Sequence, residues 1–168
     1  AGAAGISLEN EHLRVEFAPD GTFRLTDKAT GKIYSDLCEF EDSGDVGNEY
    51  IFRAPDGETP LTTKNAAAAV RLVRDDAFAA AVEIVRRWDI PASADAGLAE
   101  EQEAMVPVWE RKARRSRETV ALGLRTIVTL EKNAREVKLR IEVDNRAKDH
   151  RLRVKFQTDI RTGVHYAD

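Results

Sequence analysis

Apolar and charged residues alternate with a period of two in several segments of the chain. Residues 137–143 read Val-Lys-Leu-Arg-Ile-Glu-Val, and residues 152–156 repeat the alternation after a polar turn at 144–149. The same pattern occurs in residues 13–17 and again in residues 122–130. Because a period of two places successive side chains on opposite faces of an extended chain, each segment predicts a strand with one buried face.

Turn-forming residues separate the predicted strands at short intervals. Pro19-Asp20-Gly21 lies between two alternating segments, where Pro fixes φ and Gly supplies a positive φ. Residues 30–32 and 131–133 are predicted turns, and Asp75-Asp76 is predicted to join two further extended segments. Frequent turns between one-sided strands predict an all-β fold in which antiparallel sheets pack as a β-sandwich.

Three segments do not follow the strand pattern. Residues 94–104 are rich in Ala, Glu and Gln, and Ser93 or Asp95 can act as the N-cap of a short helix there. The four alanines at 66–69 are interpreted as a strand edge or short turn, despite their helix propensity. The basic residues within 110–117 are interpreted as a solvated connection.

Composition excludes several classes of protein. The 168 residues carry 26 Lys and Arg against 30 Asp and Glu, and this net charge of -4 argues against nucleic acid as a partner. The basic run Arg111–Arg117 is the strongest argument for nucleic-acid binding, but a run of this length is usually a solvated face. We also expect no membrane partner, because no stretch approaches the ~18 apolar residues of a spanning helix. The single cysteine, Cys38, cannot form a disulfide within the chain.

Familiar catalytic and metal-binding motifs are missing from the sequence. The three histidines, His12, His150 and His165, lie in separate segments without zinc-ligand spacing, and are interpreted as exposed or singly hydrogen-bonded. Cys38 is interpreted as a buried, inert thiol. The chain has no Gly-x-Ser-x-Gly motif and no glycine-rich phosphate loop, so neither a serine-hydrolase elbow nor a phosphate-binding loop is indicated.

One acidic segment, residues 39–50, is the best candidate for a functional loop. It concentrates carboxylates and two glycines before Tyr50, whose ring and hydroxyl suit a sugar. A calcium site and a glycosidase pair of carboxylates are alternatives, although the spacing does not match an EF-hand. A solvated or sugar-binding loop is the favoured interpretation.

Several blocks of residues resemble glycoside hydrolase family 38, the α-mannosidases. Residues 8–15 (Leu-Glu-Asn-Glu-His-Leu-Arg-Val) and 20–28 resemble the start of the family's β-sandwich region. Residues 40–50, Phe-Glu-Asp-Ser-Gly-Asp-Val-Gly-Asn-Glu-Tyr, are similar to the bacterial signature Glu-Asp-x-Gly-Asp-x-Gly-Asp-x-Tyr, and residues 143–154 are similar to a further block. Their order along the chain makes the resemblance specific.

The resemblance implies that the chain is part of a larger enzyme. It implies a galactose-mutarotase-like supersandwich at 6–168, with 1–5 as linker or cloning residues. A zinc-binding barrel and a helical bundle precede the sandwich in the family, and the barrel supplies zinc, nucleophile and general acid for retaining hydrolysis. The expected partners are therefore these barrel and helical domains and an α-mannoside. The resemblance also implies no catalytic residue and no metal ligand within this chain, which alone is expected to be inactive.

The resemblance also implies site residues. Tyr50 matches the tyrosine that reaches the barrel and hydrogen-bonds the bound mannose, and Asp45 and Asn48 are further candidate substrate-binding residues. Asn48 stands where the signature usually has Asp, which weakens any requirement for a carboxylate there. A stand-alone carbohydrate-binding or protein-interaction module is the alternative function. A cytoplasmic location is expected, and mannooligosaccharides and mannosylglycerate-type substrates are both open.

Overall fold

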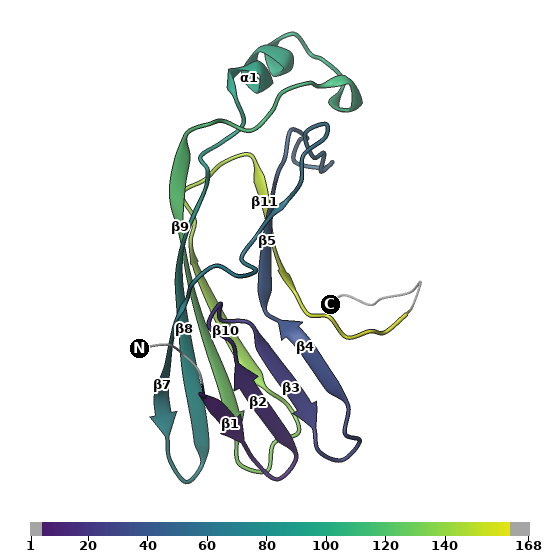
Figure 1. The fold of residues 1–168 in the computed structure, drawn as a ribbon. Helices are drawn as coiled ribbons and strands as arrows, with labels where there is room; N and C mark the ends of the chain where they lie inside the picture. The colour runs from purple at the N-terminus through teal and green to yellow at the C-terminus, as the bar shows by residue number, and fades with distance from the viewer. Residues whose placement is uncertain (1–4, 162–168) are drawn as a thin grey trace.

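The strands form three antiparallel sheets in the computed structural model, which describes residues 5–161 (Figure 1). Their orders are β1-β2-β3-β4, β10-β9-β8-β7 and β11-β5-β6. The bounds are β1 (Ser7–Glu9), β2 (Leu13–Phe17), β3 (Phe23–Asp27), β4 (Ile33–Leu37), β5 (Glu39–Gly44), β6 (Leu61–Thr62), β7 (Ala69–Asp75), β8 (Ala79–Pro91), α1 (Ala96–Glu103), η1 (Val108–Glu110), β9 (Thr119–Glu131), β10 (Lys138–Asp144) and β11 (His150–Lys155).

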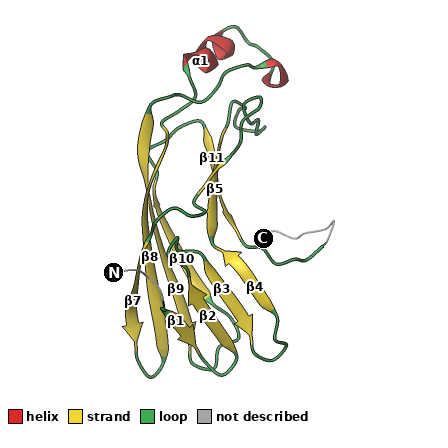
Figure 2. Cartoon of the chain, viewed as in Figure 1, coloured by secondary structure: helices red, strands yellow, loops and turns green. Residues whose placement is uncertain are grey.

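The main hydrophobic core lies between the first two sheets and continues to the third. Val15 and Phe23 come from the first sheet, Ile84 and Leu122 from the second, and Phe40 from β5; all belong to one buried cluster. The predicted all-β antiparallel sandwich is therefore confirmed, and Figure 2 shows how little of the chain is helical. Among the described residues, no helix combines the length and the apolar character that crossing a membrane requires.

Strands β8 and β9 form a long hairpin at the centre of the second sheet. β8 and β9 pair in register from Ala79 opposite Glu131 to Pro91 opposite Thr119. At the far end of this hairpin, residues 92–118 leave the sheet and form what we call the cap, which contains α1 and η1 (Figure 1). The predicted helix near 94–104 is confirmed: Asp95 is its N-cap, and Asp95 Oδ1 accepts a hydrogen bond from the Gly97 amide at 3.1 Å.

The predicted turn at residues 19–21 is held from the opposite sheet. Gly21 has a φ of +73°, and the buried Arg86 donates from Nε and Nη2 to the Asp20 carbonyl at 2.9 and 2.5 Å. A Cβ added to Gly21 would lie 2.5 Å from both Arg86 Nη2 and Ile84 Cγ2. The glycine is therefore required both by the backbone conformation and by the close approach of β8.

Strand β10 is less buried than its alternating sequence predicts. Leu139 is 36% exposed and Val143 is 42% exposed. The physical reason is position: β10 is the edge strand of its sheet, hydrogen-bonded to β9 alone among the described strands. The alternation determines which side chains share a face, whereas the extent of cover depends on the opposing sheet.

Candidate functional site

The acidic segment is divided between a buried strand and a loop. Its first half forms β5, in which Asp42 and Ser43 are buried, so interpreting the whole segment as a solvated or sugar-binding loop was wrong for this half. β5 pairs with both β11 and β6 and is therefore the central strand of its sheet. Residues 45–60, which we call the β5–β6 loop, extend beyond the sheet toward the cap (Figure 1).

Asn48 shapes the turn that carries Tyr50. Asn48 Oδ1 accepts hydrogen bonds from the Tyr50 amide at 2.9 Å and the Ile51 amide at 2.8 Å. The chain folds back so closely that a Cβ added to Gly47 would lie 1.8 Å from the Ile51 carbonyl oxygen. Both bonds use the side-chain oxygen, so the amide of Asn48 provides what the carboxylate of Asp would provide.

Asp45 stabilises the same loop from its beginning. Asp45 Oδ1 accepts hydrogen bonds from the Gly47 amide at 2.8 Å and the Arg53 amide at 3.1 Å. The Val46 amide in turn donates to the Arg53 carbonyl at 2.8 Å. The structure therefore gives Asp45 and Asn48 a defined role in building the loop, and it does not test their predicted contact with substrate.

Tyr50 lies on the outer surface of this loop. Its exposed fraction is 87%, and the next two side chains, Ile51 and Phe52, are also exposed. Trp109 of the cap is 68% exposed, and a shallow hollow of about 330 Å³ joins it to the loop; its lining is Ile51, Phe52, Arg53, Ala54, Val108 and Trp109. We call Tyr50, Ile51, Phe52 and Trp109 the apolar tip. Such a cluster of aromatic surface is typical of a contact site.

A second, polar hollow lies beside the tip. It measures about 370 Å³, and its lining is Asp45, Gly47, Asn48, Glu49, Leu98, Gln102, Asp149 and His150. The structure therefore brings the predicted residues Asp45 and Asn48 to one hollow, whereas Tyr50 does not line it. Carboxylate and amide groups at its rim are suited to hydrogen bonds with hydroxyl groups.

The basic run of the cap is not a solvated connection throughout. Arg111 is only 8% exposed, and its Nη1 donates to the carbonyls of Val46 at 2.8 Å and Gly47 at 2.5 Å. Arg115 is also largely covered, with 9% of its side chain exposed. The interpretation of residues 110–117 as solvated was wrong at these two positions because the β5–β6 loop packs over them.

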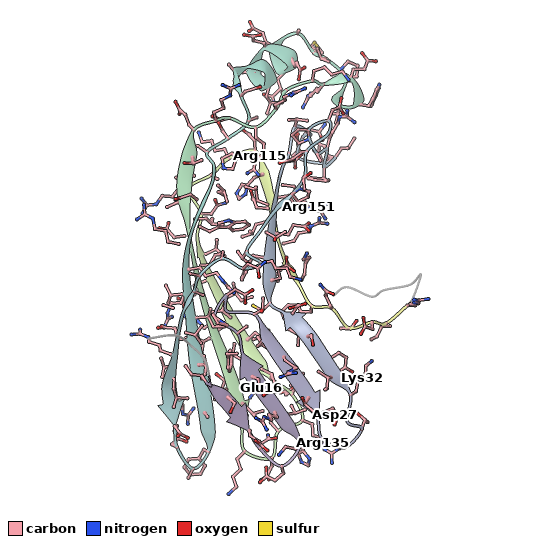
Figure 3. The ribbon with its side chains drawn as sticks, in the orientation of Figure 1. Glu16, Asp27, Lys32, Arg115, Arg135 and Arg151 are labelled. Atoms are coloured by element: carbon pink, nitrogen blue, oxygen red, sulfur yellow. The ribbon has the colours of Figure 1, made fainter. Side chains whose placement is uncertain are left out.

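Arg115 forms a buried ionic cluster with β5. Arg115 Nη2 lies 2.5 Å from Asp42 Oδ2, and Asp42 is completely buried. Arg115 Nη1 lies 3.4 Å from Glu58 Oε1, and the Glu58 carboxylate accepts from the Gly44 amide with both oxygens at 3.0 Å. The two ends of the β5–β6 loop are therefore tied together and to the cap. Figure 3 shows Arg115 at this junction.

His150 completes the cluster from β11. Its Nδ1 lies 2.5 Å from Asp42 Oδ1 and its Nε2 lies 3.1 Å from Asn145 Oδ1, with 5% of the side chain exposed. The expectation of an exposed or singly hydrogen-bonded histidine was therefore wrong for His150. His165 lies outside the described residues.

Within residues 5–161, no group of three or more His, Cys, Asp or Glu side chains is placed to hold a metal ion. Burial raises the pKa of the Cys38 thiol, which is completely buried as predicted and is a poor nucleophile. The carboxylates of Asp42 and Glu58 both lie against the guanidinium of Arg115.

Sequence reasoning missed Arg111, Arg115 and His150. A signal for the arginines was present, because Arg111, Ala113 and Arg115 are spaced by two and face inward, whereas Lys112 and Arg114 are exposed. A period of two inside a charged run distinguishes a one-sided extended segment from a uniformly solvated one.

Comparisons with known proteins identify the region to which the chain is similar. Residues 8–168 match the family model described as the glycosyl hydrolases family 38 C-terminal domain. A curated protein of Halalkalibacterium halodurans, named as a putative mannosylglycerate hydrolase, is 42% identical over 162 residues, covering 96% of this chain and 18% of that protein.

Solved structures give the same result in three dimensions. An α-mannosidase from Enterococcus faecalis aligns with a TM-score of 0.94 at 37% identity, covering 100% of this chain and 19% of that one. A structure described as a protein in glycosyl hydrolase family 38, also from E. faecalis, aligns equally well and is covered over 20% of its length. The chain thus spans about a fifth of the length of the proteins it matches.

Proposed function

Because the chain belongs to the C-terminal domain family of the family 38 glycosyl hydrolases, we propose that it is the non-catalytic β-sandwich segment of an α-mannosidase and contributes the β5–β6 loop to the sugar site. The observation that carries the loop's role is the presentation of Tyr50. An ordered turn, held by Asn48 and Gly47, projects a tyrosine that is 87% exposed. An exposed ring and hydroxyl on a hydrogen-bonded turn suit the recognition of a sugar held by another domain.

The remaining catalytic groups belong to other domains under this proposal. The zinc ion, the nucleophile and the general acid of a retaining hydrolysis would come from a preceding barrel, with a helical bundle between barrel and sandwich. Retaining hydrolysis needs two carboxyl groups about 5 Å apart across the scissile bond. Within the β5–β6 loop, the carboxylates of Asp45 and Glu58 accept hydrogen bonds from backbone amides, which supports the expectation that this chain alone is inactive.

The substrate proposed for the whole enzyme is an α-mannoside. One relative is named as a putative mannosylglycerate hydrolase and another as an α-mannosidase. The proposal includes both mannosylglycerate and other α-mannosides as substrates. The apolar tip would meet the other domains of the enzyme. A cytoplasmic location is part of the proposal, supported by the family resemblance and by Cys38 being a free, buried thiol.

A stand-alone carbohydrate-binding or protein-interaction module is the second candidate. The apolar tip favours it, because Tyr50 and Trp109 are both exposed and a hollow lined in part by Ile51, Phe52 and Trp109 lies between loop and cap. The two functions differ in what the isolated chain binds. Titration of this 168-residue chain with α-mannosides should show no saturable binding below millimolar concentrations under the first proposal, and clear binding under the second.

The decisive experiment is hydrolysis of an aryl α-mannoside by the full-length enzyme carrying Tyr50→Phe. A fall of at least about tenfold in kcat/KM, equivalent to roughly 1.4 kcal/mol, is expected if the Tyr50 hydroxyl stabilises the transition state. Tyr34→Phe is the matched control, because Tyr34 lies on β4, away from the cap (Figure 1). Equal activity of Tyr50→Phe and wild type would contradict the loop's role.

A further inference from the structure

The cap has a part in presenting the loop that family membership does not assign. We propose that Arg111 is a positioning residue, which acts from the cap to fix the turn that places Tyr50 in the sugar site. The inference rests on the proposed function of the β5–β6 loop. Arg111 touches no substrate in this scheme; it acts only through the loop backbone.

The contacts of Arg111 are concentrated on two consecutive peptide units. Nη1 donates to the Val46 carbonyl at 2.8 Å and to the Gly47 carbonyl at 2.5 Å. Hydrogen bonds from a charged donor are roughly twice as strong as neutral ones, and these are buried. Gly47 immediately precedes Asn48, whose Oδ1 holds the Tyr50 amide. Arg111 therefore fixes the peptide from which the Tyr50 turn begins.

The backbone around Arg111 is itself fixed to the rest of the cap. The Glu101 carboxylate accepts hydrogen bonds from the Lys112 amide at 2.6 Å and the Ala113 amide at 3.2 Å. Ala113 packs in a second apolar cluster, whose other members are Val46, Ala94 and Leu98. Val46 is the loop's residue in this cluster. At its first turn, the loop therefore meets the cap through the apolar side chain of Val46 and the guanidinium of Arg111.

The chemistry of the contact favours positioning over stability alone. The hydrogen-bond partners of Arg111 among the described residues are three backbone carbonyls, those of Val46, Gly47 and Val106. Burying a charge against neutral acceptors carries a desolvation penalty, which offsets part of the stability that these hydrogen bonds contribute. A guanidinium makes the hydrogen bonds directional, because its planar donors hold the carbonyls at set angles.

The test is a double-mutant cycle in the full-length enzyme, with an aryl α-mannoside as substrate. The variants are Arg111→Ala, Tyr50→Ala and the double substitution, with Arg117→Ala as control because Arg117 is an exposed arginine of the same run. We expect each single variant to lose about tenfold or more in kcat/KM, and the double variant to lose no more than about twofold beyond Tyr50→Ala. Arg111→Lys should recover part of the loss.

A second measurement does not depend on turnover. Hydrogen exchange of the Tyr50 and Ile51 amides, which bond to Asn48 Oδ1, should accelerate at least about tenfold in Arg111→Ala, while amides of the β8–β9 hairpin keep wild-type rates. Acceleration in both regions would indicate general destabilisation and overturn the positioning role, as would unchanged exchange at Tyr50 and Ile51.

The outcomes separate this inference from the function on which it rests. If Tyr50→Ala lowers kcat/KM strongly while Arg111→Ala keeps wild-type kcat/KM, the positioning role alone is overturned. Multiplicative losses in the double variant also overturn it, because Arg111 would then act independently of Tyr50. If Tyr50→Ala keeps wild-type activity, the loop's role in the proposed function fails first, whatever Arg111→Ala does, and the positioning role fails with it.

Discussion

Arg115 of the cap and Asp42 of β5 form a buried ion pair in which Nη2 and Oδ2 are 2.5 Å apart. The second oxygen of Asp42 meets His150 Nδ1 at the same distance. One fully buried carboxylate thus joins three segments that are distant in the sequence: β5, the cap and β11. Removing a partner from such a pair leaves an uncompensated buried charge, which is far more costly than losing a surface pair.

Arg115→Ala should therefore destabilise this 168-residue chain by about 3–5 kcal/mol, because Asp42 remains buried. Arg114→Ala, an exposed neighbour, should change stability by less than about 0.5 kcal/mol. Urea unfolding followed by circular dichroism measures both. The double variant Asp42→Leu/Arg115→Met should be less destabilised than Arg115→Ala; equal loss would show that packing rather than charge dominates.

The substitutions Gly21→Ala and Gly31→Ala separate two contributions to the loss of stability, the strain of a positive φ and the clash of the added Cβ. Both glycines have a positive φ, +73° and +72°, but a Cβ at Gly31 meets nothing within 4 Å, whereas at Gly21 it meets Arg86 and Ile84 at 2.5 Å. Gly31→Ala should cost about 1–2 kcal/mol from conformation alone. Gly21→Ala should cost roughly 1–3 kcal/mol more from overpacking. Equal unfolding midpoints for the two variants would refute the close approach of β8.

The Glu83 carboxylate makes the free energy of unfolding depend on pH in the acid range. Hydrogen bonds and charge from Arg71, and then from Arg125, lower the pKa of Glu83 below the usual 4.5. The two guanidiniums cover the carboxylate, whose residue is 2% exposed. Because the folded-state pKa is depressed, this stabilisation is fully present above about pH 4.5 and is lost as the pH falls through the lower folded-state value.

The comparison of wild type with Glu83→Gln tests this dependence. Wild type should have the higher Tm at pH 7, and the difference should shrink as the pH falls below about 4.5 and the wild-type carboxylate binds a proton. Thermal unfolding in buffers of constant ionic strength measures the difference at each pH. A gap that stays constant down to pH 3 would mean that the ionised pair contributes nothing.

Asn48→Asp and Asn48→Ala distinguish an acceptor role from a charge role. An aspartate can accept the same bonds from the Tyr50 and Ile51 amides, so Asn48→Asp should keep kcat/KM of the full-length enzyme within about twofold. Asn48→Ala loses two hydrogen bonds worth about 1 kcal/mol each, and kcat/KM should fall at least about fivefold. A large loss in Asn48→Asp alone would instead indicate that the uncharged amide meets the substrate.

Family membership and fold class were accessible from the sequence. The period-two segments and the turn at Pro19-Asp20-Gly21 predicted an antiparallel sandwich, which the sheets confirm. The blocks at residues 8–28, 40–50 and 143–154 together indicated family 38, which the family match confirms. These features are local: the alternation, the positive φ of Gly21 and the N-cap at Asp95 depend on a few neighbouring residues. The site roles of Tyr50, Asp45 and Asn48 stay predictions.

Only the tertiary structure decided what happens to the charged residues. The sequence places Asp42 in an acidic run and Arg115 in a basic run, and each run by itself resembles a solvated face. Folding brings β5, β11 and the cap together, and burial then selects Asp42, Arg115, Arg111 and His150 while Lys112 and Arg114 stay in water. A strand's pattern is set within the strand, but burial of a charge depends on partners more than 60 residues away along the chain.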